Sequence, residues 1–197
     1  LDRARGVGGQ MMNTTAPPQE LDSVRRNAEC LADPITINQA CDRMAAEITE
    51  KLSRTNPVLL GVMTGGLTPL AMLLQRLDFP LQTDYAHLTR YGMRVSGGEL
   101  RWIRKPPESV RDRTVLVVDD LLDHGITLQA VREVCYELGA AEVMTAVLVT
   151  KQIDDRAGLK STSFSALTLP DRYLFGCGMD YKSYLRNAPG IFAVSDE

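Results

Sequence analysis

Three apolar runs, separated by segments with helical spacing, constrain the fold of this chain more than any other feature. They read VLLGVM (58–63), VLVV (115–118) and VMTAVLV (143–149). Short, almost continuous apolar runs are typical of strands buried on both faces of a sheet. Strands that alternate with helices predict an α/β fold with a mostly parallel sheet. Ligands bind such sheets at the carboxyl ends of the strands, so the residues after these runs are the first candidates for a functional site.

Turn and capping signals place the remaining elements. Thr36 and Gln39 form a capping-box pattern before a helix over 37–53. Thr68 and Pro69 suit the cap and first position of a helix over 70–77, and a third helix follows 115–118 and stops at Gly139. Further strands are expected over 81–89, 164–169 and 173–176, with a hairpin or loop within 90–107.

Size, charge and cysteine spacing exclude several classes of protein. The 197 residues, 44% of them hydrophobic, suit one domain with a substantial core. No apolar stretch approaches the roughly 20 residues that span a bilayer. Residues 1–12 lack the apolar region of a signal peptide, and we expect the native chain to start at Met11 or Met12. A net charge of −3 argues against a general nucleic-acid binder. Four cysteines without CxxC spacing suit buried side chains in a reducing cytoplasm.

An unusual group of polar residues follows the run at 115–118, in the stretch DDLLDHGITL (119–128). A helix N-terminus has free N–H groups that bind anions, and Gly125 permits close approach. Residues 123–127 can therefore form a phosphate cradle, although an ordinary turn capped by Asp123 or Thr127 is the alternative. Asp119 and Asp120 can bind ribose hydroxyls and Mg²⁺. Alternatively, Asp119 pairs with a lysine or arginine and Asp120 faces solvent.

The combination is more specific than its parts. An apolar strand, an acidic pair, two residues and then D-x-G-x-T-L resembles the signature with which type I phosphoribosyltransferases bind phosphoribosyl pyrophosphate (PRPP). LPDRYLFGCGMDYKSYLRNAPGI (169–191) resembles the C-terminal motif of the hypoxanthine-guanine phosphoribosyltransferases. GVMTGG (61–66) is similar to their pyrophosphate loop, and LDFPLQTDYAHLTRYG (77–92) to the strand before their flexible loop. The ordered resemblance covers about residues 33–194. It implies their fold, a twisted, mostly parallel sheet flanked by helices, with a small hood from the N- and C-terminal segments.

The resemblance implies a set of PRPP contacts. Asp119 and Asp120 would bind the ribose hydroxyls, directly or through hydrated Mg²⁺, and Asp180 would contact a second Mg²⁺. A flexible loop around Arg90 and Tyr91 would close over the reacting centre. The 5′-phosphate would be held by the backbone of His124, Gly125, Ile126 and Thr127, with the Thr127 hydroxyl. Pyrophosphate would be held by Thr64, Gly65 and Arg186.

A second set of contacts is implied for a purine base. Asp123 would lie near N7 and act as general base, Lys151 would donate to the exocyclic O6, Tyr173 would stack on the ring, and the Leu174 backbone would read its edge. A lysine only donates hydrogen bonds, so it suits a 6-oxopurine better than adenine. Each residue has a simpler alternative: Lys151 can be a solvated strand-end lysine and Tyr173 part of the core. Arg186 can pair with Asp180 or Glu197.

Three positions depart from the family pattern. His124 replaces a threonine of D-T-G-x-T, so one hydroxyl is lost; its ring can bind the phosphate instead, more strongly when protonated, or can point to solvent. Thr64 stands where many relatives carry lysine or arginine, so the pyrophosphate loop is expected to work through the backbone of Gly65 and Gly66. The resemblance implies a non-proline cis peptide in this loop. Arg90 replaces a serine, and we expect it to supply the charge that Thr64 lacks.

The function implied is that of a purine salvage enzyme, a hypoxanthine/guanine phosphoribosyltransferase that uses Mg²⁺, PRPP and a 6-oxopurine. A non-catalytic sensor of PRPP or nucleotides with the same fold is one alternative, and a xanthine-preferring enzyme is another. A third hypothesis, which makes no use of the C-terminal motif, is a phosphatase or receiver domain in which an aspartate becomes phosphorylated. We expect a flexible extension over 1–30, a single domain over 31–197, and a cytoplasmic homodimer or homotetramer without nucleic-acid or membrane partners.

Overall fold

The computed structural model describes residues 18–91 and 99–195 of the chain, without the side chains of Arg90, Tyr91 and Glu99. The expected start at Met11 or Met12 therefore lies outside the described residues. Within the described residues, no helix is long and apolar enough to cross a membrane.

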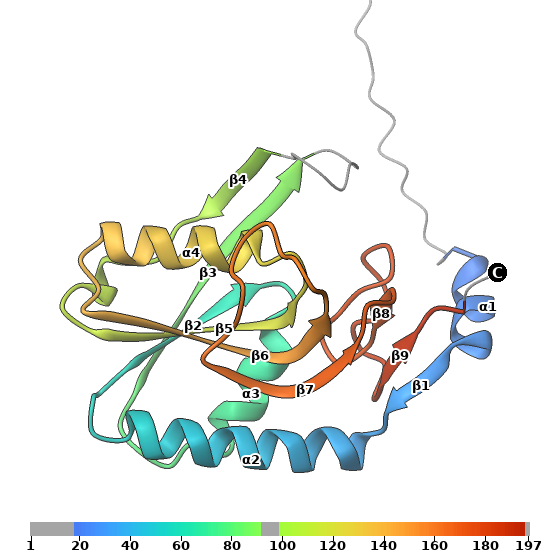
Figure 1. Ribbon diagram of the computed structural model, residues 1–197, viewed down its shortest axis with the longest axis horizontal. Helices are drawn as coiled ribbons and strands as arrows, with labels where there is room; N and C mark the ends of the chain where they lie inside the picture. Colours follow the sequence, from blue (N-terminus) through green and yellow to red (C-terminus); the bar gives the residue numbers. More distant parts are fainter. Residues whose placement is uncertain (1–17, 92–98, 196–197) are drawn as a thin grey trace, which may run out of the picture.

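A six-stranded sheet forms the centre of the molecule (Figure 1). Its order is β4-β3-β2-β5-β6-β7. Neighbouring strands are parallel, except that β4 runs antiparallel to β3. This confirms the predicted α/β fold. The strands are β2 (Val58–Met63), β3 (Gln82–Tyr91), β4 (Glu99–Arg104), β5 (Thr114–Leu122), β6 (Glu142–Gln152) and β7 (Phe164–Pro170). A 3₁₀ turn, η1 (Glu108–Val110), precedes β5.

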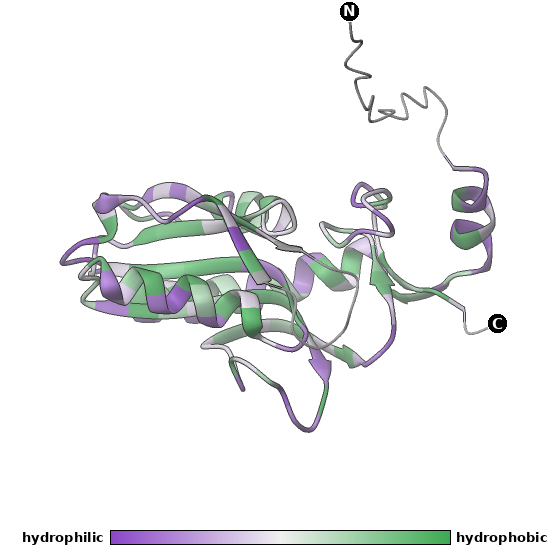
Figure 2. Ribbon diagram, turned by 90° about the horizontal axis from the view of Figure 1, so that it is seen from above, coloured by the Kyte–Doolittle hydropathy of each residue, from purple (hydrophilic) through white to green (hydrophobic). Residues whose placement is uncertain are grey.

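Helices cover both faces of this sheet (Figure 1). Successive strand residues point to opposite faces, so Val115 and Val117 pack in one cluster with Val131 and Cys135 of α4 (Ile126–Glu137). Leu116 and Val118 pack in the other cluster, beneath α2 (Pro34–Leu52) and α3 (Leu67–Leu74). The central strands are mostly hydrophobic, and the helices carry both hydrophobic and hydrophilic residues (Figure 2). Burial on both faces explains why these strands read as continuous apolar runs.

A second, smaller sheet forms the expected hood beside the carboxyl ends of the main strands (Figure 1). It has the order β1-β9-β8, with β1 (Glu29–Ala32), β8 (Leu174–Phe175) and β9 (Ile191–Ala193) antiparallel to one another. Helix α1 (Glu20–Asn27) precedes it. The domain boundary expected at residue 30 thus falls inside β1, and residues 20–27 of the expected extension are helical.

Several element boundaries differ from the prediction. Helix α2 begins at Pro34 and not at residue 37, because the Asp33 Oδ1 atom accepts a hydrogen bond of 2.7 Å from the Thr36 N–H and caps the helix. Helix α3 begins at Leu67 after Gly66, so Thr68 and Pro69 lie inside its first turn, and it ends at Leu74 instead of residue 77. Strand β5 continues through Leu122.

Candidate functional site

The carboxyl-terminal half of β5 carries the acidic pair. Asp119 and Asp120 lie inside the strand rather than after it, because β5 remains paired with β6 as far as Leu122. They follow the alternation of the strand, so their side chains leave on opposite faces. The Asp119 side chain accepts a hydrogen bond of 2.9 Å from the Asp120 N–H. Asp119 is 8% exposed and Asp120 is partly buried.

This pair is electrostatically unfavourable without a ligand. Burial raises the pKa of Asp119 well above its usual value, and the charge of Asp120 raises it further. Burial also raises the pKa of Asp120, against the opposing effects of the Asp119 hydrogen bond and the Arg186 charge. Removal of water disfavours the charged form of a carboxyl group. A positively charged or hydrogen-bonding ligand would therefore be bound with relief of this repulsion.

Asp120 faces the loop after β2 and a turn of the C-terminal segment. A Cβ atom on Gly65 would lie 2.1 Å from Asp120 Oδ2, so only glycine allows this approach. A cis peptide bond joins Met63 to Thr64 within the same loop, as expected. Arg186 Nη1 lies 3.8 Å from Asp120 Oδ2. The loop and the Arg186 guanidinium thus meet over Asp120, while the Thr64 side chain is exposed.

Arg186 is held by the turn that carries it. Its Nη2 pairs with Asp180 Oδ1 at 2.7 Å, and its Nη1 donates a hydrogen bond of 2.6 Å to the Gly178 carbonyl. The Asp180 Oδ2 atom in turn accepts from the Ser183 N–H at 2.7 Å. The simpler alternative of an Arg186–Asp180 pair is therefore present. In this pair the Arg186 side chain remains about one-third exposed, and it still lies close to Asp120.

The turn between β5 and α4 has the geometry of an anion cradle. Gly125 has φ of 76°, and the first hydrogen bond of α4 runs from the Gln129 N–H to its carbonyl at 3.0 Å. The N–H groups of residues 126–128, which include Ile126 and Thr127, consequently lack helical partners. Within the described residues, the half-buried His124 side chain makes no hydrogen bond, and its carbonyl accepts from the Gly158 N–H at 2.8 Å.

Lys151 lies near the end of β6 and is buried, with 9% exposure, so the solvated-lysine alternative is wrong. Its Nζ atom lies 3.5 Å from Asp123 Oδ1 and 3.2 Å from Asp171 Oδ1. A buried ammonium needs charged partners to offset its desolvation, and the two carboxylates supply them. Asp171 was missed by sequence reasoning, although it belongs to the quoted P-D-R-Y stretch.

Tyr173 and Leu174 follow Asp171, the partner of Lys151, by two and three residues. The Tyr173 side chain is 53% exposed, so it does not belong to the core. Its ring meets that of Tyr181 edge-on, with centroids 5.5 Å apart and planes at 66°. Leu174 is buried and its backbone pairs with Ala193 of β9. An exposed aromatic face of this kind can stack on a flat heterocycle.

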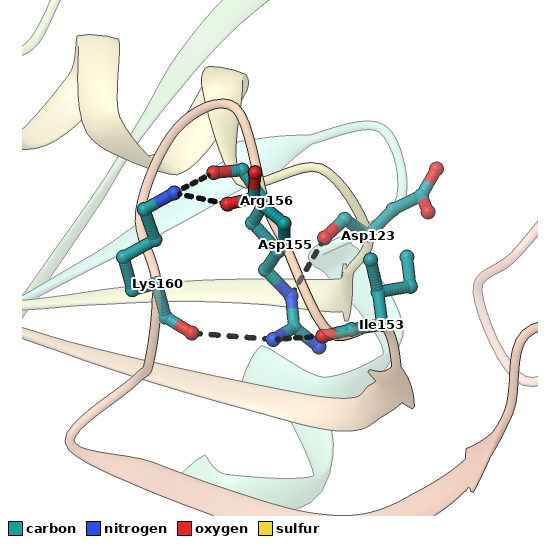
Figure 3. Close-up of polar contacts among 5 residues, drawn as sticks. All are labelled: Asp123, Ile153, Asp155, Arg156 and Lys160. Carbon is teal, nitrogen blue, oxygen red and sulfur yellow. Dashed lines mark hydrogen bonds and ion pairs between the residues drawn. The ribbon is translucent and has the colours of Figure 1, made fainter.

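A second residue that sequence reasoning missed is Arg156, in the loop between β6 and β7. Its side chain is buried and donates hydrogen bonds to main-chain carbonyls, including that of Asp123 (Figure 3). Arg156 lies outside the sequence motifs described above. The predicted flexible loop lies partly outside the described residues, since 92–98 and the side chains of Arg90 and Tyr91 are not described.

Three acidic residues of the site could hold a metal ion together with a phosphate ligand. No group of three or more His, Cys, Asp or Glu side chains in residues 18–91 and 99–195 is arranged to hold a metal ion. Mg²⁺ is commonly bound by one or two carboxylates plus substrate phosphates and waters. The Asp119–Asp120 pair and Asp180 offer such partial sites.

Comparison with known proteins gives the same picture. The family description "phosphoribosyl transferase domain" matches residues 31–182. The hypoxanthine-guanine phosphoribosyltransferase of Bacillus subtilis is 31% identical over 79% of this chain and 86% of its own. That of Streptococcus pneumoniae is 29% identical over 82% and 89%. A hypoxanthine-guanine-xanthine phosphoribosyltransferase of Tritrichomonas foetus is 30% identical over 79% and 85%.

Solved structures share the fold. The crystal structure of a hypoxanthine phosphoribosyltransferase from Staphylococcus aureus superposes with a TM-score of 0.81. It is 22% identical and covers 88% of this chain and 95% of its own. The Trypanosoma cruzi hypoxanthine phosphoribosyltransferase with IMP gives a TM-score of 0.77 at 22% identity, over 86% and 92% of the two chains.

Proposed function

This chain belongs to the phosphoribosyltransferase family, and from that premise we propose that it transfers the phosphoribosyl group of PRPP to hypoxanthine or guanine, giving IMP or GMP and pyrophosphate. The names of its relatives at about 30% identity support this purine salvage reaction. The observation that carries the proposal is the buried Lys151 ammonium beside Asp123. A donor and a carboxylate at this spacing match the O6 and N7–H of a 6-oxopurine.

Asp123 and Lys151 would act together on the base. The N9 atom of the purine forms a bond to C1 of the ribose while the bond from C1 to the pyrophosphate oxygen breaks. Asp123 accepts the proton that leaves N7. The Lys151 ammonium donates to O6, where negative charge collects as the proton departs. Asp171, whose Oδ1 lies 3.2 Å from Lys151 Nζ, would hold the ammonium in place without taking part in the proton transfer.

The same groups account for selection against adenine. The 6-amino group of adenine is a donor and would face the Lys151 ammonium, which has no acceptor. In a buried pocket, an unmatched pair of donors costs about 1–3 kcal/mol, equivalent to about 5- to 150-fold in specificity. Tyr173 would stack on the ring, and the Leu174 backbone would contact its edge.

The other side of the site would hold PRPP. The N–H groups at the start of α4 would bind the 5′-phosphate, whose negative charge suits the positive end of the helix. Arg186 and the loop with Thr64 and Gly65 would bind the pyrophosphate. Arg186 already lies close to Asp120 of β5 and would neutralise charge on the leaving group.

Mg²⁺ is part of this proposal as a partner of PRPP. Asp119, Asp120 and Asp180 would hold it, because carboxylate oxygens and substrate phosphates are the ligands that Mg²⁺ usually takes. When bound, the ion would neutralise negative charge on the pyrophosphate. We therefore expect PRPP to bind poorly without Mg²⁺.

We also propose a cellular compartment and an oligomeric state for this protein. All four cysteines are free thiols, which suits a reducing cytoplasm. A homodimer or homotetramer is expected, and light scattering would measure it. No nucleic acid or membrane has a part in the reaction.

A pyrophosphate-release assay with PRPP and Mg²⁺ tests the function, with hypoxanthine, guanine, xanthine and adenine supplied in turn. Release with hypoxanthine or guanine and almost none with adenine is expected. Xanthine is included because the relative of 30% identity from Tritrichomonas foetus is named for it. Binding of PRPP without release with any base would refute catalysis and favour a PRPP sensor.

A further inference from the structure

The loop between β6 and β7 surrounds a buried guanidinium. Arg156 is 9% exposed. Its Nη1 donates to the carbonyls of Ile153 and Lys160, each at 3.2 Å (Figure 3). Its Nη2 donates to the Lys151 carbonyl. These bonds close residues 151–160 into a compact turn, and a hydrogen bond of 2.8 Å from Lys160 Nζ to Asp155 Oδ1 closes it further.

One further bond of this guanidinium leaves the loop. Arg156 Nε donates to the Asp123 carbonyl at 2.9 Å (Figure 3). Asp123 follows the end of β5 and Lys151 belongs to β6, so a single planar side chain joins the main chains of both residues. The side chains of the same two residues also meet, since the Lys151 Nζ atom lies 3.5 Å from Asp123 Oδ1.

The loop also supports the turn before α4. The Gly158 N–H donates to the His124 carbonyl at 2.8 Å, and the Leu159 N–H donates to the Gly125 carbonyl at 3.1 Å. The packing is tight on both sides. A Cβ on Gly158 would lie 2.5 Å from the Gly125 carbonyl carbon, and one on Gly125 would lie 2.3 Å from the Leu159 oxygen. The loop and the turn can therefore shift only together.

No carboxylate pairs with this guanidinium in residues 18–91 and 99–195, so its bonds go to main-chain carbonyls. A buried arginine bound to carbonyls from several segments orders those segments relative to one another, because its five donors lie in one rigid plane. An ammonium has the same charge but lacks the planar fork.

We propose that Arg156 is a positioning residue: its guanidinium fixes the main chains of Asp123 and Lys151 at the separation that lets the carboxylate and the ammonium contact one purine base. The inference rests on the proposed function and adds a residue to it. Arg156 does not touch the substrate. A displacement of about 1 Å between reacting groups can cost about 100-fold in rate.

Arg156→Met and Arg156→Lys test the proposal, with Arg113→Met as the matched control. Arg113 also donates to a main-chain carbonyl, that of Asn56, and to Gln82, but it precedes the amino end of β5, away from the site. Both Arg156 variants should lower kcat/KM for hypoxanthine by about 10- to 100-fold and narrow the preference for hypoxanthine over adenine. Arg113→Met should lower the melting temperature and leave that preference unchanged.

Chemical rescue separates geometry from charge. Arg156→Ala assayed with ethylguanidinium at non-denaturing concentrations should recover activity and base preference, whereas ethylammonium should not. An Arg156→Lys variant with wild-type base preference would overturn the proposal, and so would rescue by ethylammonium to the same degree.

Amide exchange distinguishes this inference from the proposed function. Faster exchange at Gly158 and Leu159 is expected in Arg156→Met, with no such change in Arg113→Met. A wild-type protein that makes no nucleotide refutes the proposed function. Unchanged exchange at these two amides in Arg156→Met overturns the role of Arg156, even if the wild type proves inactive. An active wild type together with an equally active Arg156→Met variant overturns the role of Arg156 and leaves the proposed function intact.

Discussion

Gly125 is the position at which a single methyl group should damage the site most specifically. Its φ of 76° is the left-handed conformation, which costs an alanine about 1–2 kcal/mol. The added Cβ would also lie 2.3 Å from the Leu159 carbonyl oxygen and 2.6 Å from the Leu159 nitrogen. These are backbone atoms and cannot rotate away, so the loop must move, at a further cost of about 1–3 kcal/mol. Gly125→Ala should thus be destabilised by about 2–5 kcal/mol.

Gly139→Ala is the matched control at the other end of α4. Gly139 has φ of 91°, and the nearest atom to its Cβ would be Arg111 Nη1 at 3.2 Å, the end of a flexible side chain. Only the conformational cost of about 1–2 kcal/mol should remain. In a chain of this size, 1 kcal/mol corresponds to about 2–4 °C. Calorimetry should therefore give a clearly larger loss for Gly125→Ala.

Steady-state kinetics supply the functional half of this prediction. Displacement of the turn should misalign an N–H donor to the 5′-phosphate, and a hydrogen bond to a charged group contributes about 1.5–3 kcal/mol. The KM for PRPP should rise by about 10- to 100-fold in Gly125→Ala and stay unchanged in Gly139→Ala. Equal losses of melting temperature in the two variants, with an unchanged KM for PRPP, would refute the cradle.

Three further predictions concern side chains of the site. Burial raises the pKa of Asp119 in the folded state, so the wild type should lose stability as the pH rises from the unfolded value near 4 through the folded one. Asp119→Asn should escape this loss in thermal melts at neutral pH, while losing PRPP turnover; a lower melting temperature would contradict the reasoning. Lys151→Gln should lower kcat/KM for hypoxanthine by about 10- to 100-fold, from a charged hydrogen bond of about 1.5–3 kcal/mol, without raising the KM for PRPP. For His124, the KM for PRPP should be higher in His124→Ala than in the wild type, because a ring donor to the 5′-phosphate is lost; equal KM values would exclude the ring as a phosphate ligand.

Local patterns predicted the sheet because burial on both faces leaves a direct mark on the sequence. The runs at 58–63, 115–118 and 143–149 all became central strands. The start of α2 could also have been predicted, since Asp33 and Pro34 are good cap and first-position residues. The capping-box pattern at Thr36 and Gln39 led instead to a predicted start of the helix that was three residues too late.

Other features depend on contacts between distant segments. Strand β5 continues past Val118 because β6 pairs with it as far as Leu122, and no local pattern reports that. The hood sheet joins β1 to β9 across almost the whole chain, so only the family resemblance pointed to it. Asp171 pairs with Lys151, and Arg156 binds the carbonyls around Lys151. These contacts form only when folding brings separate loops together.

In the proposed reaction the strand ends hold PRPP against a 6-oxopurine, and Lys151 selects the oxo group. The most direct measurement supplies hypoxanthine and adenine together at equal concentration with limiting PRPP and Mg²⁺, and separates the nucleotides by chromatography. The account predicts IMP as almost the sole nucleotide. Comparable amounts of IMP and AMP, or no nucleotide while PRPP remains bound, would contradict it.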